Sequence, residues 1–314
     1  MADRLVVVGA PSSAGAYAPG QEQTPQALRS AGLLDKLRDR GIEVDDRGDT
    51  DLIRWRSDRE NRHAMNAGAV ARAATQVAQR VRDGLAVEGS AVLVVGGDCT
   101  VELGTVAGAV SCRDRVGLVY IDHDTDLNTP KSTTEGALDW MGVAHLLALD
   151  DTLPEVAGIG PRVPLLKPEQ VLLFANASPT TFERGVIEST GITEVPHEFV
   201  EDDPAGAALG VVEGWAAKFD HLLVHLDIDV VDFADAPLAE NTRRNTGLSL
   251  DTLVAALKVL VAAPNWCGLT LCEVNPDHGE PDGSTMEDLA THLADVVAGA
   301  AGRPTSRSSR VGLS

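Results

Sequence analysis

Short apolar runs alternate with longer segments of helical period along the whole chain. Several runs are almost continuously apolar, as a strand must be when it is buried on both faces. Alternation of such strands with helices is typical of a parallel sheet covered by helices. The sequence therefore predicts an α/β fold, with strands at residues 5–8, 42–44, 91–95, 116–121, 170–174, 221–228 and 269–272.

Two helices carry start signals. Ser249 is predicted to cap a helix whose apolar residues between 250 and 260 share one face. Residues 284–287 read Ser-Thr-Met-Glu, the pattern of a capping box, and precede a second apolar face. Residues 45–62 are densely charged with both signs, so we expect a solvated loop or helix face there.

The chain length and composition suit one large domain. The chain has 314 residues, of which 44% are hydrophobic, and no linker or repeat divides it. We therefore predict a single domain over residues 1–302. Residues 303–314 are small, polar and basic, so we expect a flexible C-terminal tail.

The net charge limits the partners. With 26 basic and 47 acidic side chains, the formal charge is −21, which repels nucleic acid and anionic membrane surfaces but attracts cations. The 4 cysteines are too few and too scattered for a disulfide framework. With no signal-peptide pattern and no long apolar run, the sequence predicts a cytoplasmic protein.

Three predicted strands run directly into polar residues, within 92–100, 117–126 and 223–229. Side chains two residues apart share a face in extended chain. Asp122, Asp124 and Asp126 therefore share one face, and His225, Asp227 and Asp229 share another. The carboxyl edge of a parallel sheet, where these residues would emerge, is where open sheets bind ligands.

The crowding of acids at that edge favours a metal. Two carboxylates about 4 Å apart repel by roughly 4 kcal/mol at an effective dielectric constant near 20. Protonation would relieve one or two of the five acids, whereas divalent cations such as Mn²⁺ or Mg²⁺ would relieve all of them. The alternative is that each acid merely caps a helix or turn after its strand.

Four segments together resemble the arginase (ureohydrolase) family. They are Gly-Gly-Asp-Cys-Thr at 96–100, residues 122–130, His-Leu-Asp-Ile-Asp at 225–229 and Glu-Val-Asn-Pro at 273–276. The resemblance spans nearly the whole chain. It implies a three-layer sandwich around a mostly parallel eight-stranded sheet, two divalent metal ions with Mn²⁺ as the first expectation, hydrolysis at a guanidinium carbon, and a homo-oligomer.

The resemblance also assigns candidate residues. The metal ligands it implies are Asp122, Asp126, Asp227 and Asp229. Glu273 matches the carboxylate that holds the guanidinium, and Asn128 matches a contact to the substrate carboxylate.

Cys99 and Asp124 stand where the family usually has histidine. We expect both to bind metal, and Cys99, as a softer thiolate, would tolerate Zn²⁺ or Fe²⁺. The alternative for Cys99 is a buried small hydrophobic residue. His225 is an additional candidate ligand, although a lone histidine is more often a core residue, and His123 should point away from the acids.

The substrate region departs from arginases as well. Asp139 stands where they have a proton-shuttling histidine, so it is either the shuttle or a surface turn residue. Glu135 replaces a serine that helps to bind the substrate carboxylate. A carboxylate facing a carboxylate would repel it, so free L-arginine is disfavoured and a second cationic or amide end is favoured.

The sequence thus predicts a metal-dependent hydrolase that cleaves a C–N bond of a small cationic guanidino or amidine compound and releases urea or a substituted urea. Glu273 and Asp139 are its predicted catalytic residues. The alternatives are an N-hydroxyguanidine or formimino substrate, or a non-catalytic binding protein on the same fold. Nucleophilic Ser or Cys chemistry is disfavoured, because the sequence contains no GxSxG motif and no nearby Cys/His pairing.

Overall fold

Eight parallel strands form one sheet in the computed structural model, which describes residues 4–301. The order across the sheet is β2-β1-β3-β8-β7-β4-β5-β6, and every neighbouring pair is parallel. The predicted parallel eight-stranded sheet is confirmed. The strands are β1 (Arg4–Gly9), β2 (Glu43–Asp49), β3 (Ser90–Val95), β4 (Val116–Ile121), β5 (Val171–Phe174), β6 (Thr193–Val195), β7 (His221–Asp227) and β8 (Trp266–Cys272).

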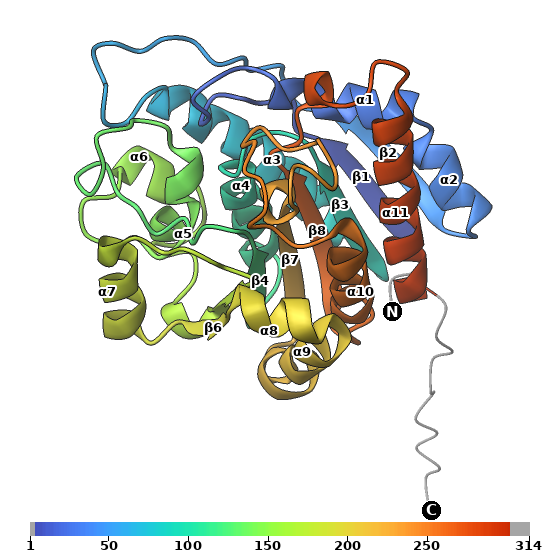
Figure 1. Ribbon diagram of the computed structural model, residues 1–314. Helices are drawn as coiled ribbons and strands as arrows, with labels where there is room; N and C mark the ends of the chain where they lie inside the picture. Colours follow the sequence, from blue (N-terminus) through green and yellow to red (C-terminus); the bar gives the residue numbers. More distant parts are fainter. Residues whose placement is uncertain (1–3, 302–314) are drawn as a thin grey trace, which may run out of the picture.

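Helices cover both faces of the sheet, which gives the predicted three layers (Figure 1). One face packs against α3 (Ala67–Leu85), α4 (Val101–Val110), α5 (Gly142–Leu146), α6 (Pro154–Ala157) and α7 (Thr181–Thr190). The other packs against α1 (Thr24–Ser30), α2 (Leu33–Asp39), α8 (His197–Asp202), α9 (Pro204–Gly210), α10 (Leu250–Val261) and α11 (Ser284–Ala301).

The continuously apolar strands are explained by two cores, one on each face. In β1, Leu5 and Val7 point into one core, while Val6 and Val8 point into the other. All four side chains are at most 2% exposed. Alternate residues thus fill opposite layers, as the period of an extended chain requires.

The two edges of the sheet differ from the prediction. Residues 45–49 belong to β2 instead of a loop, because an edge strand pairs on one side only and tolerates charged side chains. Arg29 pairs with Asp46 there at 2.9 Å. The opposite edge is β6, which was not predicted, since three mostly polar residues give no strand pattern.

The two helix starts also differ from each other. Ser249 caps α10 as predicted, accepting a hydrogen bond from the Thr252 amide at 3.1 Å. The prediction of a capping box at Ser284 is wrong, because the cap stands before the first helical residue and Ser284 is itself the first residue of α11. Its amide donates to Asp282 Oδ1 at 2.9 Å, so the chain is capped from the preceding turn.

The predicted tail at residues 303–314 lies outside the described residues. Within the described part of the chain, no helix is both long enough and apolar enough to cross a membrane.

The predicted motifs all follow four adjacent strands at the centre of the sheet, β3, β8, β7 and β4. Because these strands are parallel, the segments that follow them meet at one edge. Residues distant in sequence are thereby brought together, and this edge carries the candidate site.

Candidate active site

A cavity of about 300 Å³ opens at the carboxyl ends of the four central strands. Every residue predicted for the site except His225 lines it: Cys99, Asp122, Asp124, Asp126, Asn128, Glu135, Asp139, Asp227, Asp229 and Glu273. The position of the aspartates at the carboxyl edge was predicted from the strand pattern, and the other residues were assigned by the family resemblance.

The acids form two overlapping groups with the geometry of a cation site. Potential ligand atoms of Cys99, Asp122 and Asp227 lie within 4.8 Å of one another, and so do those of Asp122, Asp124 and Asp229. Asp126 belongs to neither group, and its carboxylate accepts a hydrogen bond from the Tyr120 hydroxyl.

In both Asp-x-Asp segments, the carboxylate of the first aspartate accepts a hydrogen bond from the amide of the second. Asp122 Oδ1 accepts the Asp124 amide at 2.7 Å, and Asp227 Oδ1 accepts the Asp229 amide at 2.7 Å. Among the described residues, nothing makes a hydrogen bond to Asp122 Oδ2 or Asp229 Oδ1, although both atoms are buried. Unpaired buried carboxylate oxygens are costly, and oxygen ligands of this kind suit a divalent ion.

Burial and mutual repulsion dominate the electrostatics. Burial, followed by repulsion from Asp229, raises the pKa of Asp122 and of Asp227 well above the ordinary value. Burial, followed by Asp122, does the same to the pKa of Asp126. These acids are therefore held together at a cost that a bound cation would offset.

Arg243 is a functional residue that the sequence analysis missed. Its guanidinium bonds Asp124 through two nitrogens, at 3.0 and 2.7 Å, and also bonds Asp229. Burial alone lowers the pKa of Arg243, but the two carboxylates outweigh burial and raise the pKa. Among the described residues lining the cavity, Arg243 is the one basic side chain, so it neutralises this side of the cluster.

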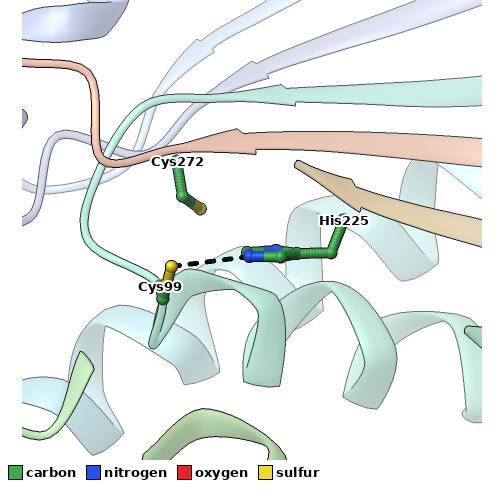
Figure 2. Close-up of side chains that lie close together, drawn as sticks. All are labelled: Cys99, His225 and Cys272. Atoms are coloured by element: carbon green, nitrogen blue, oxygen red, sulfur yellow. Dashed lines mark hydrogen bonds between the residues drawn. The ribbon is translucent and has the colours of Figure 1, made fainter. Parts of the chain in front are cut away.

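His225 is not among the residues that line the cavity, and its imidazole points toward Cys99 (Figure 2). Its Nε2 is 3.4 Å from Cys99 Sγ, which also donates to Asp227 Oδ2 at 3.2 Å. The sequence shows no nearby Cys/His pairing, but the sheet brings together this pair from residues 126 positions apart. His123 packs its ring edge toward His197, at 6.3 Å between centroids.

Cys272, the last residue of β8, completes a second cluster with Cys99 and His225 (Figure 2). Burial alone raises the pKa of Cys272, but Cys99 and His225 outweigh it and lower the pKa. Burial alone lowers the pKa of His225, but Cys272 and Glu102 raise it to about 10. The sequence analysis treated Cys272 only as part of an apolar strand.

Glu273 follows Cys272 with a left-handed backbone, at φ 62°. Its Oε1 accepts the Cys99 amide at 2.8 Å, and its Oε2 accepts Gln21 Nε2 at 3.0 Å. A non-glycine residue pays a conformational cost at this φ, which is common where a side chain serves a site. The carboxylate is thus held firmly at the cavity wall.

Asp139 also lines the cavity, and it is at the same time a turn residue, so both predicted alternatives stay open. It is half-buried at the start of the helical turn Asp139–Met141, where its Oδ1 accepts the Trp140 amide at 2.9 Å. Burial, then Asp98, raises its pKa well above the ordinary value.

The outer part of the cavity is lined by acidic side chains, and some of its polar groups already make hydrogen bonds to one another. Asn128 Nδ2 donates to Glu183 Oε1 at 2.9 Å, and Thr125 donates to the same oxygen at 2.8 Å. Glu183 and Glu240, which the sequence analysis did not single out, line the cavity with Glu135. This part of the cavity therefore suits a cationic or amide group better than a carboxylate.

The chain resembles known proteins over nearly its full length. A family model described as "Arginase family" matches residues 3–299. Arginase-1 of Sus scrofa is 29% identical over 301 residues, covering 93% of this chain and 91% of that protein. A crystal structure of arginase from Bacillus cereus superposes with a TM-score of 0.83 at 24% identity, covering 96% of this chain and 99% of that one. Formimidoylglutamase from Bacillus subtilis superposes with a TM-score of 0.76 at 16% identity, covering 97% and 89%.

Proposed function

Since this chain belongs to the arginase family, we propose that it is a metal-dependent hydrolase that cleaves a C–N bond of a guanidino or related amidine compound and releases urea or a substituted urea. The observation that carries the proposal is Glu273, a carboxylate only 7% exposed beside a cluster of buried acids. A carboxylate in this position is best compensated by a planar cation such as a guanidinium.

The cavity fits divalent metal. Asp122, Asp126, Asp227 and Asp229 are its proposed oxygen ligands, together with Asp124 and Cys99. The unpaired oxygens Asp122 Oδ2 and Asp229 Oδ1 support this assignment. When bound, divalent ions would lower the pKa of water and polarise the amidine carbon. Two ions, with Mn²⁺ first, is the expectation from the family resemblance.

The protein's own residues would orient the substrate and handle protons. Glu273 would accept two N–H groups of the guanidinium while Gln21 and the Cys99 amide hold it in place. Asp139, whose pKa is raised by burial, would deliver a proton to the departing nitrogen. Asn128 and Glu135 would contact the rest of the substrate, and the acidic lining favours a small substrate with a cationic or amide end.

The proposal is tested by urea release. Protein loaded separately with Mn²⁺, Fe²⁺, Zn²⁺ or Ni²⁺ would be incubated with guanidino, N-hydroxyguanidino and formimino compounds, with urea, hydroxyurea and formamide as respective readouts. We expect turnover of at least one guanidino compound. Turnover confined to another amidine would replace the substrate class, and absence of turnover with every ion would contradict hydrolysis.

Glu273→Gln provides the sharper arm of this test. The amide keeps the size of the side chain but removes its charge, so kcat/KM should fall by about 100-fold. Glu280→Gln, an exposed acid just beyond the same strand, is the matched control and should retain wild-type turnover. Equal activity of the two variants would contradict the role of Glu273.

A further inference from the structure

Two thiols and an imidazole lie close together (Figure 2), and one of them, Cys99, also belongs to a group of carboxylates. Cys99 comes from the segment between β3 and α4, His225 from β7 and Cys272 from the end of β8. All three are at most 2% exposed, and their ligand atoms lie within 4.8 Å of one another. The proposed hydrolysis has no use for Cys272, and this buried grouping therefore needs its own explanation.

The spacing of the three side chains suits one tetrahedral ion. Zinc binds sulfur at about 2.3 Å and nitrogen at about 2.0 Å, so adjacent sulfur and nitrogen ligands lie roughly 3.6 Å apart. The observed distance from Cys99 Sγ to His225 Nε2 is 3.4 Å. Asp227 Oδ2 lies 3.2 Å from Cys99 Sγ but groups with Cys99 and Asp122, so the three side chains leave the fourth tetrahedral position open.

His225 has the surroundings of a metal-binding imidazole. Glu102, only 1% exposed, places Oε2 3.4 Å from His225 Nδ1. Neither atom has a hydrogen-bond partner among the described residues, so the contact is electrostatic; a carboxylate beside Nδ1 favours a proton there and leaves the lone pair of Nε2 for a metal. The Tyr120 ring stacks on the imidazole at 4.0 Å and 12°, which holds its orientation.

The charges on the two sides of Cys99 also differ. Asp124 and Asp229 receive the Arg243 guanidinium, whereas no lysine or arginine contacts the two cysteines among the described hydrogen bonds and ion pairs. Two thiolates would carry two negative charges, which one divalent ion balances. Thiolate and imidazole ligands favour Zn²⁺ over Mn²⁺.

We propose that Cys99, His225 and Cys272 form a binding site for one soft divalent ion of the Zn²⁺ class, with Glu102 as the positioning residue for His225. The site requires ion binding and not turnover, so it goes beyond the proposed hydrolysis. It places a soft ion on the inner side of a cavity whose outer side is neutralised by arginine.

The test measures metal directly on the full-length chain. Chelator-treated, reduced protein would be titrated with Zn²⁺, Co²⁺ and Mn²⁺, and bound metal would be counted by mass spectrometry. We expect about one Zn²⁺ to bind per chain more tightly than Mn²⁺. The Co²⁺ form should show a thiolate-to-cobalt charge-transfer band in the near ultraviolet, which carboxylate ligands do not give.

Variants assign the ligands. Cys272→Ser should weaken Zn²⁺ binding by at least about 100-fold and reduce the cobalt band, and Glu102→Gln should weaken it by about 10-fold. Cys267→Ser, which changes a buried cysteine of the same strand, is the matched control for folding and should bind Zn²⁺ normally. Circular dichroism would establish that each variant is folded.

Three results would overturn the site. One is unchanged Zn²⁺ affinity and cobalt absorption in folded Cys272→Ser, and another is a Cys99–Cys272 disulfide that persists in the wild-type protein after treatment with a reductant. Failure of hydrolysis would be a separate result, because Zn²⁺ binding without urea release would still support the proposed ion site. Urea release with Mn²⁺ and no thiolate band supports the hydrolase and overturns the soft site.

Discussion

The inner and outer sides of the candidate site balance their negative charge in different ways. On the outer side, Asp124 and Asp229 are neutralised by Arg243, a cation that the chain itself provides. On the inner side, Cys99 and Cys272 face an imidazole that is itself paired with Glu102. Cys99 and Asp124 both stand where the family usually has histidine. They therefore differ in whether a bound metal ion is needed to balance their negative charge. The neighbours of a ligand, more than the motif around it, decide that demand.

Asp227→Asn should have the largest effect on this comparison, because Asp227 contacts both sides. It lies 3.2 Å from Cys99 Sγ, and its Oδ1 accepts the Asp229 amide. The asparagine oxygen can still accept that bond, so the loop should fold. We expect the affinities for Zn²⁺ and Mn²⁺ each to fall by at least about 100-fold in metal titrations.

Asp220→Asn, at the exposed residue just before the same strand, is the control and should leave both affinities unchanged. A loss of only one ion's affinity in Asp227→Asn would show that the two sides do not share this carboxylate.

Arg243→Gln should have an intermediate effect, confined to the outer side. Removing the guanidinium leaves Asp124 and Asp229 without their cation, so a hard ion should replace it. Because Arg243 is 28% exposed, solvent screens part of the charge. We expect Mn²⁺ affinity to rise by about 10-fold and the bound Mn²⁺ per chain to increase, as measured by calorimetry and metal analysis.

The adjacent Arg244 gives the matched control. It lies over the Phe233 ring at 4.8 Å, away from the carboxylates, so Arg244→Gln should bind Mn²⁺ like the wild type. Equal Mn²⁺ binding in Arg243→Gln and wild type would mean that the arginine leaves the carboxylates readily when metal is supplied, and the contrast between the two sides would be lost.

The smallest predicted effect is a pH dependence of metal-induced stability. The folded-state pKa values of Asp122 and Asp227 are raised, whereas an unfolded aspartate titrates near about 3.9. Between those values the folded state binds more protons, so the contribution of these acids to stability falls as pH rises. Metal binding to the ionised acids should reverse this loss.

Thermal unfolding with and without chelator measures the effect. The increase in Tm on adding Mn²⁺ or Zn²⁺ should be a few degrees larger at about pH 8 than at about pH 6. Asp220→Asn serves again as the control, since Asp220 is exposed and distant from the cavity. A metal-induced increase that is independent of pH would contradict the assignment of the buried acids as the ligands.

The sequence could predict those parts of the fold that have a local pattern. β4 (Val116–Ile121) has the predicted bounds, because its apolar run is continuous and ends at an acid. Asp122 and Asp227 follow such strands, so their meeting at one edge was predictable. β6 was missed because its three residues are too few and too polar to show a period.

The chemistry that departs from the family could not be predicted in the same way. Arg243 lies in an irregular segment, where no periodicity indicates which way a side chain points. Cys272 ends an apolar strand, in which a cysteine is indistinguishable from a small hydrophobic residue. The Cys99–His225 contact depends on the order of strands across the sheet, which neither local segment encodes.

The central position of β8 has a consequence for how the protein is made. β8 lies between β3 and β7, although it is the last strand of the sheet to be synthesised. The bond from the Cys99 amide to Glu273 joins residues 174 positions apart, so it cannot form until nearly the whole chain has left the ribosome. Until then β3 and β7 have no partner between them. Cys272 and Glu273 therefore join the site late, whereas Asp122, Asp124 and Asp229 follow or end strands that are direct neighbours and can meet before β8 is made.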